Sequence, residues 1–158
     1  MEKILISACL LGEAVRYDGK SQPLDHPYIK RLVSEGRLIP FCPEVEGGLP
    51  VPRPPAEISG GSAEDVLGGK AKIITGEGEV TDAFVAGAKK ALDLVNRHGI
   101  RFALLKEKSP SCGSALIYDG SFRGKLVEGV GITTALLRKN EVAVYGESQI
   151  DELKKCII

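Results

Sequence analysis

A chain of 158 residues is long enough to bury a hydrophobic core, and its length fits a single domain over residues 1–158. It has 21 Lys and Arg against 21 Asp and Glu, so its net charge of zero argues against a general nucleic-acid surface. Aromatic residues make up 5% and Trp is absent, so platforms on which bases could stack are scarce.

The first residues of the chain bear on where the protein works. Residues 1–7 have a strand pattern rather than that of a secretion signal, because the apolar part is too short and no cleavage site follows. No apolar run is long enough to cross a membrane. We therefore expect a cytoplasmic protein whose four Cys stay reduced, as metal ligands, catalytic groups or core residues.

The first third of the chain alternates strand and helix patterns. Residues 3–7 predict a buried strand, and apolar residues at helical spacing predict a short helix over residues 27–35. A second strand is expected at residues 38–41. Cys9 and Cys42 each come just after one of these strands.

Residues 45–69 are rich in Pro and Gly. As a linker, this stretch would divide the chain into two domains. However, Arg53 and Glu57 lie among the prolines, and proline lowers the entropic cost of fixing a loop. We interpret the stretch as an ordered loop near a site.

The second half of the chain begins with a predicted hairpin, in which residues 71–75 and 79–81 pair around a Gly-Glu-Gly turn. Thr81 and Asp82 cap the clearest helix, which Gly99 ends. The remaining expected elements are strands at 102–105, 115–118 and 142–145, a hairpin at 117–122, and helices at 134–139 and 150–155.

Alternating strands and helices predict an α/β fold. We expect a single three-layer domain with a mostly parallel, Rossmann-like sheet, plus the Pro/Gly-rich loop and small hairpins. Ligands of such sheets bind outside the carboxyl ends of the strands, where Cys9, Cys42 and Cys112 are all expected. Their wide separation in sequence excludes a local zinc finger and suits three loops that converge on one crevice.

Cys112 lies on a constrained turn between two apolar stretches. Pro110 fixes its own φ and removes a backbone donor, and Gly113 permits backbone angles that are closed to other residues. The alternative is a small buried cysteine with no role in chemistry, because free Cys is among the most buried residue types.

Three converging thiols suit a metal centre. Soft thiolates select zinc or iron–sulfur clusters, and a closed structural zinc site needs four ligands. Cys156 could be the fourth, but it lies at the end of the chain with no turn to present it, and we expect it not to be a ligand. Three ligands leave one position open, which is typical of a catalytic metal, and a four-iron cluster held by three Cys would expose one iron.

Polar side chains flank two of these cysteines. Glu44 lies two residues after the second, and Ser109 and Ser111 lie around the third, which would cluster a possible base and two hydroxyls near the thiols. The alternative is that Glu44 pairs with Arg16 or Arg53 and that the serines only cap the turn.

Eight motifs spread over nearly the whole chain are SACL at 7–10, VRYDG at 15–19, CPEVEGGL at 42–49, PRPPAE at 52–57, VTDAF at 80–84, LKEKSPSCG at 105–113, IYDGSF at 117–122 and GVGIT at 129–133. Together they resemble a prokaryotic family catalogued as domain of unknown function 523. Its characterised members are thiouracil desulfidases that use an iron–sulfur cluster. No single motif would be specific, but the set is.

The resemblance implies that Cys9, Cys42 and Cys112 bind a four-iron, four-sulfur cluster with one open iron, which takes the sulfur of the substrate. It also implies that Glu44 is the acid–base residue and that a serine of the turn at 109–111 assists.

Our main hypothesis is a desulfidase of a small thiocarbonyl heterocycle such as 2-thiouracil. The open iron binds the thione sulfur as a Lewis acid, and Glu44 activates the water that attacks the ring carbon. Arg16 and Asp18 would orient the amide edge of the ring through hydrogen bonds.

Two other classes remain. The same thiols could belong to a non-catalytic module that senses iron, sulfur or redox state, but a sensor needs no base such as Glu44. The chain could also be a nucleotide-binding α/β module with core cysteines, but its Gly-Gly pairs lack the Gly-Lys-Ser/Thr ending of a P-loop.

Overall fold

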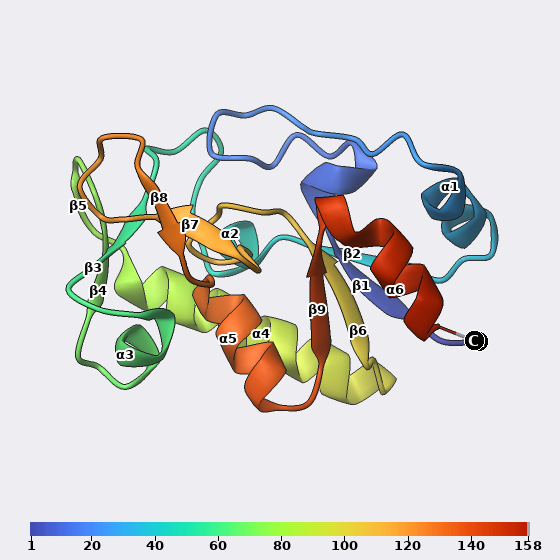
Figure 1. Cartoon of the computed structure of the whole chain (residues 1–158). Helices are drawn as coiled ribbons and strands as arrows, with labels where there is room; N and C mark the ends of the chain where they lie inside the picture. Colours follow the sequence, from blue (N-terminus) through green and yellow to red (C-terminus); the bar gives the residue numbers. More distant parts are fainter. Residues whose placement is uncertain (158) are drawn as a thin grey trace.

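The computed structural model describes residues 1–157, and its centre is a parallel four-stranded sheet (Figure 1). The strand order is β2-β1-β6-β9, and each neighbouring pair is parallel. The strands are β1 (Ile4–Ser7), β2 (Leu38–Phe41), β6 (Phe102–Leu105) and β9 (Ala143–Gly146). The predicted α/β class and mostly parallel sheet are confirmed.

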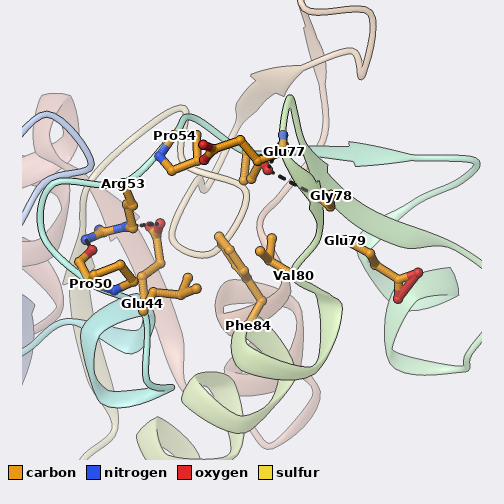
Figure 2. Close-up of a pocket in the computed structure, with 12 residues that line it drawn as sticks. Glu44, Pro50, Arg53, Pro54, Glu77, Gly78, Glu79, Val80 and Phe84 are labelled. Atoms are coloured by element: carbon orange, nitrogen blue, oxygen red, sulfur yellow. Dashed lines mark hydrogen bonds and ion pairs between the residues drawn. The ribbon is translucent and has the colours of Figure 1, made fainter.

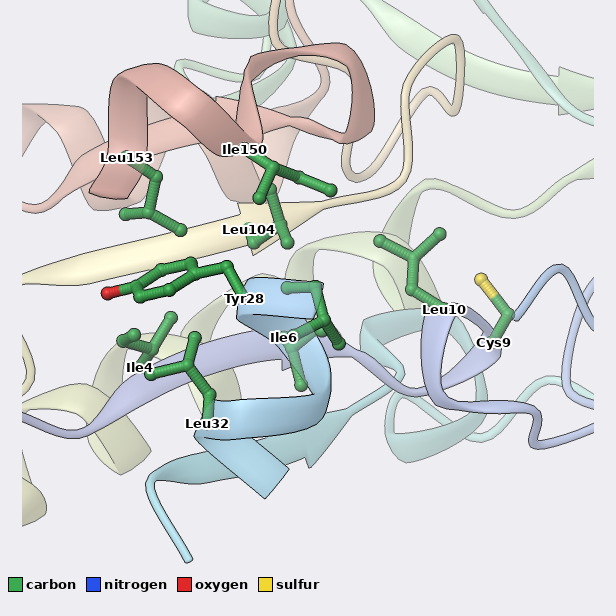
Figure 3. Close-up of a cluster of buried hydrophobic side chains, with 10 residues drawn as sticks. Ile4, Ile6, Cys9, Leu10, Tyr28, Leu32, Leu104, Ile150 and Leu153 are labelled. Atoms are coloured by element: carbon green, nitrogen blue, oxygen red, sulfur yellow. The ribbon is translucent and has the colours of Figure 1, made fainter. Parts of the chain in front are cut away.

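One face of this sheet is covered by α1 (Pro27–Ser34) and α6 (Ile150–Cys156). Successive side chains of a strand point to opposite faces, so Ile4 and Ile6 of β1 share this face. They pack with Leu104 of β6 in a buried cluster (Figure 3). The helices contribute Tyr28, Ile29, Leu32, Ile150 and Leu153 to it.

The opposite face is covered by α4 (Thr81–His98) and α5 (Ile132–Lys139). Leu5, which lies between the two isoleucines of β1, points to this side. It shares a second buried cluster with residues of β6, β9 and the two helices, namely Ala91, Val95, Ala103, Leu105, Leu137 and Val144. The sheet is therefore the middle of three layers, as expected.

The order of the strands places a switch point beside β1. After β1 the chain adds β2 on one side, and it later returns to add β6 on the other side. In open parallel sheets, such a reversal opens a crevice at the carboxyl ends of the strands, and ligands bind there. The segments that follow β1, β2 and β6 border this crevice.

Two small antiparallel sheets lie beside the main layer (Figure 1). Their strands are β3 (Glu57–Ser59), β4 (Lys72–Thr75) and β5 (Gly78–Glu79) in one sheet, and β7 (Leu116–Tyr118) and β8 (Leu126–Glu128) in the other. The first expected hairpin forms with slightly different limits, but the second pairs residues 116–118 with residues 126–128, which lie outside the predicted stretch at 117–122. Thr81 begins α4 instead of ending a strand, and the second hairpin closes through a longer loop over residues 119–125.

The Pro/Gly-rich stretch is more structured than the predicted loop. It begins within the short helix α2 (Pro43–Glu46), supplies the strand β3 and contains the helix α3 (Ala63–Leu67) near its end. A capping box between Ser62 and Asp65 starts α3. These helices are too short for apolar periodicity to reveal them. Within residues 1–157, no helix combines the length and apolar character needed to span a membrane.

Candidate active site

The three predicted thiols meet at the crevice. Cys9 lies in the 3₁₀ helix η1 (Ala8–Leu11) directly after β1, and Cys42 follows β2 and precedes the first turn of α2. Cys112 lies in the loop after β6. All three line one cavity of about 590 Å³. The predicted convergence of three loops at the carboxyl ends of parallel strands is confirmed.

Hydrogen bonds fix the turn that carries Cys112. The Ser109 hydroxyl oxygen accepts from the backbone N–H groups of Ser111, at 3.0 Å, and Cys112, at 3.1 Å. The Gly113 N–H donates to the Ser109 carbonyl at 2.8 Å. A Cβ atom on Gly113 would lie 2.8 Å from that same carbonyl oxygen, so only glycine fits. The thiol is therefore held by a turn that cannot easily rearrange.

Glu107 anchors the far side of the same loop. Its Oε1 atom accepts from the backbone N–H groups of Ser114, Ala115 and Leu116 at 2.9–3.1 Å, and its Oε2 accepts from the Ser114 hydroxyl at 2.6 Å. Burial raises the pKa of Glu107, but these hydrogen bonds outweigh it, and the pKa is lowered overall. An ionised carboxylate thus fixes the backbone that follows Cys112.

Glu44 forms an ion pair with Arg53, which is one of the two arginine partners that the sequence suggested for it. The Arg53 Nε lies 3.1 Å from Glu44 Oε1, and the two side chains are only 4% and 16% exposed. Arg53 also donates to the carbonyls of Pro50, at 3.1 Å, and Val15, at 2.9 Å. The Ser109 hydroxyl donates to the other oxygen of Glu44 at 3.4 Å. The carboxylate lines the cavity in a fixed orientation.

A smaller cavity of about 190 Å³ also borders this ion pair (Figure 2). Glu44, Arg53 and Ala56 line both cavities, so the pair lies in a shared wall. In Figure 2, Val80 and Phe84 lie across the small cavity from the pair. The carboxylate therefore borders open space on two sides.

Arg16 and Asp18 occupy different positions. Arg16 lines the main cavity, donates to Gln22 Oε1 at 2.9 Å and pairs with the Asp18 carboxylate at 3.4 Å. Asp18 is not one of the described residues that line the cavity, and it also accepts from the Lys20 N–H at 3.0 Å. In this geometry Asp18 contacts Arg16, and only Arg16 of the two lines the cavity.

Ser111 is not one of the described residues that line the cavity. Its side chain is fully buried, and its hydroxyl shares a 2.7 Å hydrogen bond with that of Thr133 at the start of α5. The two serines of the turn therefore face different surroundings. Ser109 reaches Glu44, whereas the geometry gives Ser111 a structural contact in place of the expected catalytic one.

Sequence reasoning missed Lys106 and Glu147, which also line the cavity. Lys106 Nζ donates to Glu147 Oε1 at 3.2 Å and to the Glu107 carbonyl at 3.0 Å. The other oxygen of Glu147 is buried without a hydrogen-bond partner within residues 1–157. Lys106 directly follows β6, and Glu147 directly follows β9. Both residues could therefore have been predicted, because ligands of parallel sheets bind at the carboxyl ends of the strands.

The surroundings of the three thiols disfavour their charged thiolate forms. Burial raises the pKa of Cys9 to about 11 and also raises those of Cys42 and Cys112, and the neighbouring thiols add to the increase for Cys9 and Cys112. Without metal, all three thiols are therefore protonated at neutral pH. A metal centre bound by all three thiolates would supply the positive charge that balances them.

The donor set fits a cluster better than one ion. Within residues 1–157, no three His, Cys, Asp or Glu side chains lie close enough together to hold one metal ion. Each thiolate of an iron–sulfur cluster binds a different iron, so the sulfurs surround a space instead of meeting at a point. Three thiols spread around one cavity match that requirement.

The sequence and the fold are similar to those of known proteins. The family model described as 2-thiouracil desulfurase matches residues 4–149. The uncharacterized protein YbbK of Bacillus subtilis (strain 168) is 44% identical over 151 residues, which cover 95% of this chain and 99% of that protein. A solved structure of the 4Fe-4S-dependent thiouracil desulfidase TudS is 50% identical, has a TM-score of 0.91, and covers 99% of this chain and 97% of its own.

Proposed function

Because the chain belongs to the 2-thiouracil desulfurase family, we propose that it is an iron–sulfur-dependent desulfidase of a small thiocarbonyl heterocycle such as 2-thiouracil. The observation that carries this proposal is the cavity, which brings three thiols and a fixed carboxylate together. A sensing module would need the thiols but not the carboxylate. We place the reaction in the cytoplasm, where thiols stay reduced.

Cys9, Cys42 and Cys112 would hold a 4Fe-4S cluster and leave one iron without a protein ligand. When bound, the cluster supplies a Lewis-acidic iron that polarises the thiocarbonyl group and accepts its sulfur. The buried thiols are otherwise protonated, so loading of the cluster releases their protons.

The residues of the chain then bind the ring and move a proton. Arg16, held by Asp18, donates hydrogen bonds to the amide edge of the ring. Glu44, oriented by Arg53 and Ser109, takes a proton from a water that attacks the thiocarbonyl carbon. The new carbon–oxygen bond replaces the carbon–sulfur bond, and hydrosulfide leaves. This hydrolysis consumes one water and needs no oxidant or reductant.

Anaerobic reconstitution with iron and sulfide, followed by assay on 2-thiouracil, tests the proposal. We expect uracil and sulfide to form in equal amounts and only in the iron-loaded protein. Zinc-loaded protein at the same concentration is the control for the metal. A fully loaded protein that forms no uracil would refute the proposed activity, and a protein that binds no iron would refute the proposed cofactor.

Cys156 gives a separate test of the ligand set. It is exposed on α6, with its sulfur 3.1 Å from the Tyr145 hydroxyl, and it is not one of the described residues around the cavity. We expect Cys156→Ser to leave the iron per chain unchanged, whereas the same exchange at Cys112 should lower it. Iron analysis of anaerobic preparations measures both, and iron loss in Cys156→Ser would make Cys156 a ligand.

A further inference from the structure

Half of the aromatic side chains of this protein line the cavity of about 590 Å³ that holds the three thiols. The chain has four Tyr and four Phe, and those at the cavity are Tyr17, Phe41, Tyr118 and Phe122. The low aromatic content suggested that stacking platforms were scarce, yet the fold gathers them in one place. Tyr17 and Phe122 are 43% and 41% exposed, which places them at the mouth of the cavity. Large apolar side chains left in water beside a cavity indicate a binding surface.

The backbone at Phe122 is held in a conformation that bulky residues rarely adopt, with φ at 59°. The buried carboxylate of Glu57 keeps it there, accepting from the N–H groups of Gly120 at 2.9 Å and Phe122 at 3.3 Å. A Cβ atom on Gly120 would lie 2.5 Å from the Ile58 carbonyl oxygen, so the loop passes close to β3. Such strain persists only where the surrounding structure enforces it.

The loop that carries Tyr17 is also fixed. The Arg53 N–H donates to the Tyr17 carbonyl at 2.8 Å, and the Arg53 side chain pairs with Glu44. One arginine therefore joins an aromatic residue of the mouth to the carboxylate of the site. The two exposed rings belong to different loops, and each loop is tied to a buried charged residue.

We propose that Phe122, assisted by Tyr17, stacks on the flat ring of the substrate and makes this enzyme selective for planar unsaturated heterocycles over small acyclic thiocarbonyl compounds. This inference rests on the proposed desulfidase function and specifies its substrate class. Every pyrimidine presents an extended π-face, and base–aromatic stacking contributes to affinity whatever the ring substituents. An acyclic compound such as thiourea offers too small a face to gain from it.

Kinetics of two variants at Phe122 test the proposal in the reconstituted enzyme. We expect Phe122→Leu to raise KM for 2-thiouracil about tenfold with kcat unchanged, because leucine keeps the bulk and loses the ring. Phe122→Tyr, which retains an aromatic ring, should have the same KM for 2-thiouracil as the unaltered enzyme. Turnover of thiourea should change in neither variant. Val33→Ala, at an exposed apolar residue of α1, is the control.

An unchanged KM for 2-thiouracil in Phe122→Leu would overturn the proposal. An equal loss with thiourea would also overturn it, because it would show damage to the loop and not loss of stacking. Failure of the unaltered enzyme to desulfurise 2-thiouracil would instead refute the proposed function, so the two ideas fail separately.

A second readout needs no turnover. The chain contains no Trp, so Phe122→Trp introduces a single tryptophan at the mouth of the cavity. We expect uracil, the product ring, to quench its fluorescence in a saturable way. Val33→Trp, on α1, should show no saturable change. Absence of quenching in Phe122→Trp would show that the ring does not bind at this position.

Discussion

The Glu44→Gln enzyme is expected to keep its cluster and to turn over at least about a hundredfold more slowly than the unaltered chain. Glutamine preserves the shape of the side chain, and its oxygen can still accept from Arg53 Nε, which lies 3.1 Å from Oε1 in the structure. It cannot take a proton from the attacking water. The loss should appear in turnover per cluster, measured beside the iron content of the same preparation.

A purely structural role for Glu44 makes the opposite prediction. If the carboxylate only holds Arg53 in the wall of the cavity, the glutamine variant would lose iron or thermal stability while its turnover per cluster stayed intact. Glu46→Gln is the matched control, because Glu46 lies on the same helix α2 and is not one of the described residues around the cavity. Unchanged turnover per cluster in Glu44→Gln would remove this residue from the mechanism.

The parts of the site that lie at strand ends could be predicted from sequence. Short buried strands and amphipathic helices have clear periodicities, and their alternation leads to a parallel sheet. Cys9, Cys42 and Cys112 were expected at one edge because all carboxyl ends of such a sheet share that edge. The same rule reaches Lys106 and Glu147, which directly follow β6 and β9.

The parts that depend on loop geometry could not be predicted. Ser109 and Ser111 are two residues apart in a turn, where no periodicity tells which hydroxyl faces the cavity. The aromatic residues at the mouth belong to loops that tertiary contacts hold, and Phe122 has a backbone angle that its own residue type disfavours. The interactions that Arg53 makes with three separate segments exist only after those segments have come together.

Close packing of α2 against α4 positions two of the site residues, Cys42 and Glu44. Glycine inside a helix costs about 0.5–1 kcal/mol relative to alanine, so Gly87 in the interior of α4 needs a packing reason. A Cβ atom on Gly87 would lie 1.8 Å from the Pro43 carbonyl oxygen, and one on Gly47 would lie 2.0 Å from the Ala83 carbonyl oxygen. The two backbones therefore touch, and any added carbon must separate the helices.

Gly87→Ala should consequently lower the free energy of unfolding by about 2–3 kcal/mol, even though alanine is the better helix former. The displaced α2 should move Cys42 away from Cys112, so iron per chain and turnover should fall together. Gly76→Ala is the control, because nothing lies within 4 Å of the Cβ atom it would add and its stability should change by less than about 0.5 kcal/mol. Urea unfolding and iron analysis measure the two effects. A Gly87→Ala protein as stable and as well loaded as the unaltered chain would show that α2 can shift without disturbing the cavity, and that close packing of α2 on α4 does not set the position of Glu44.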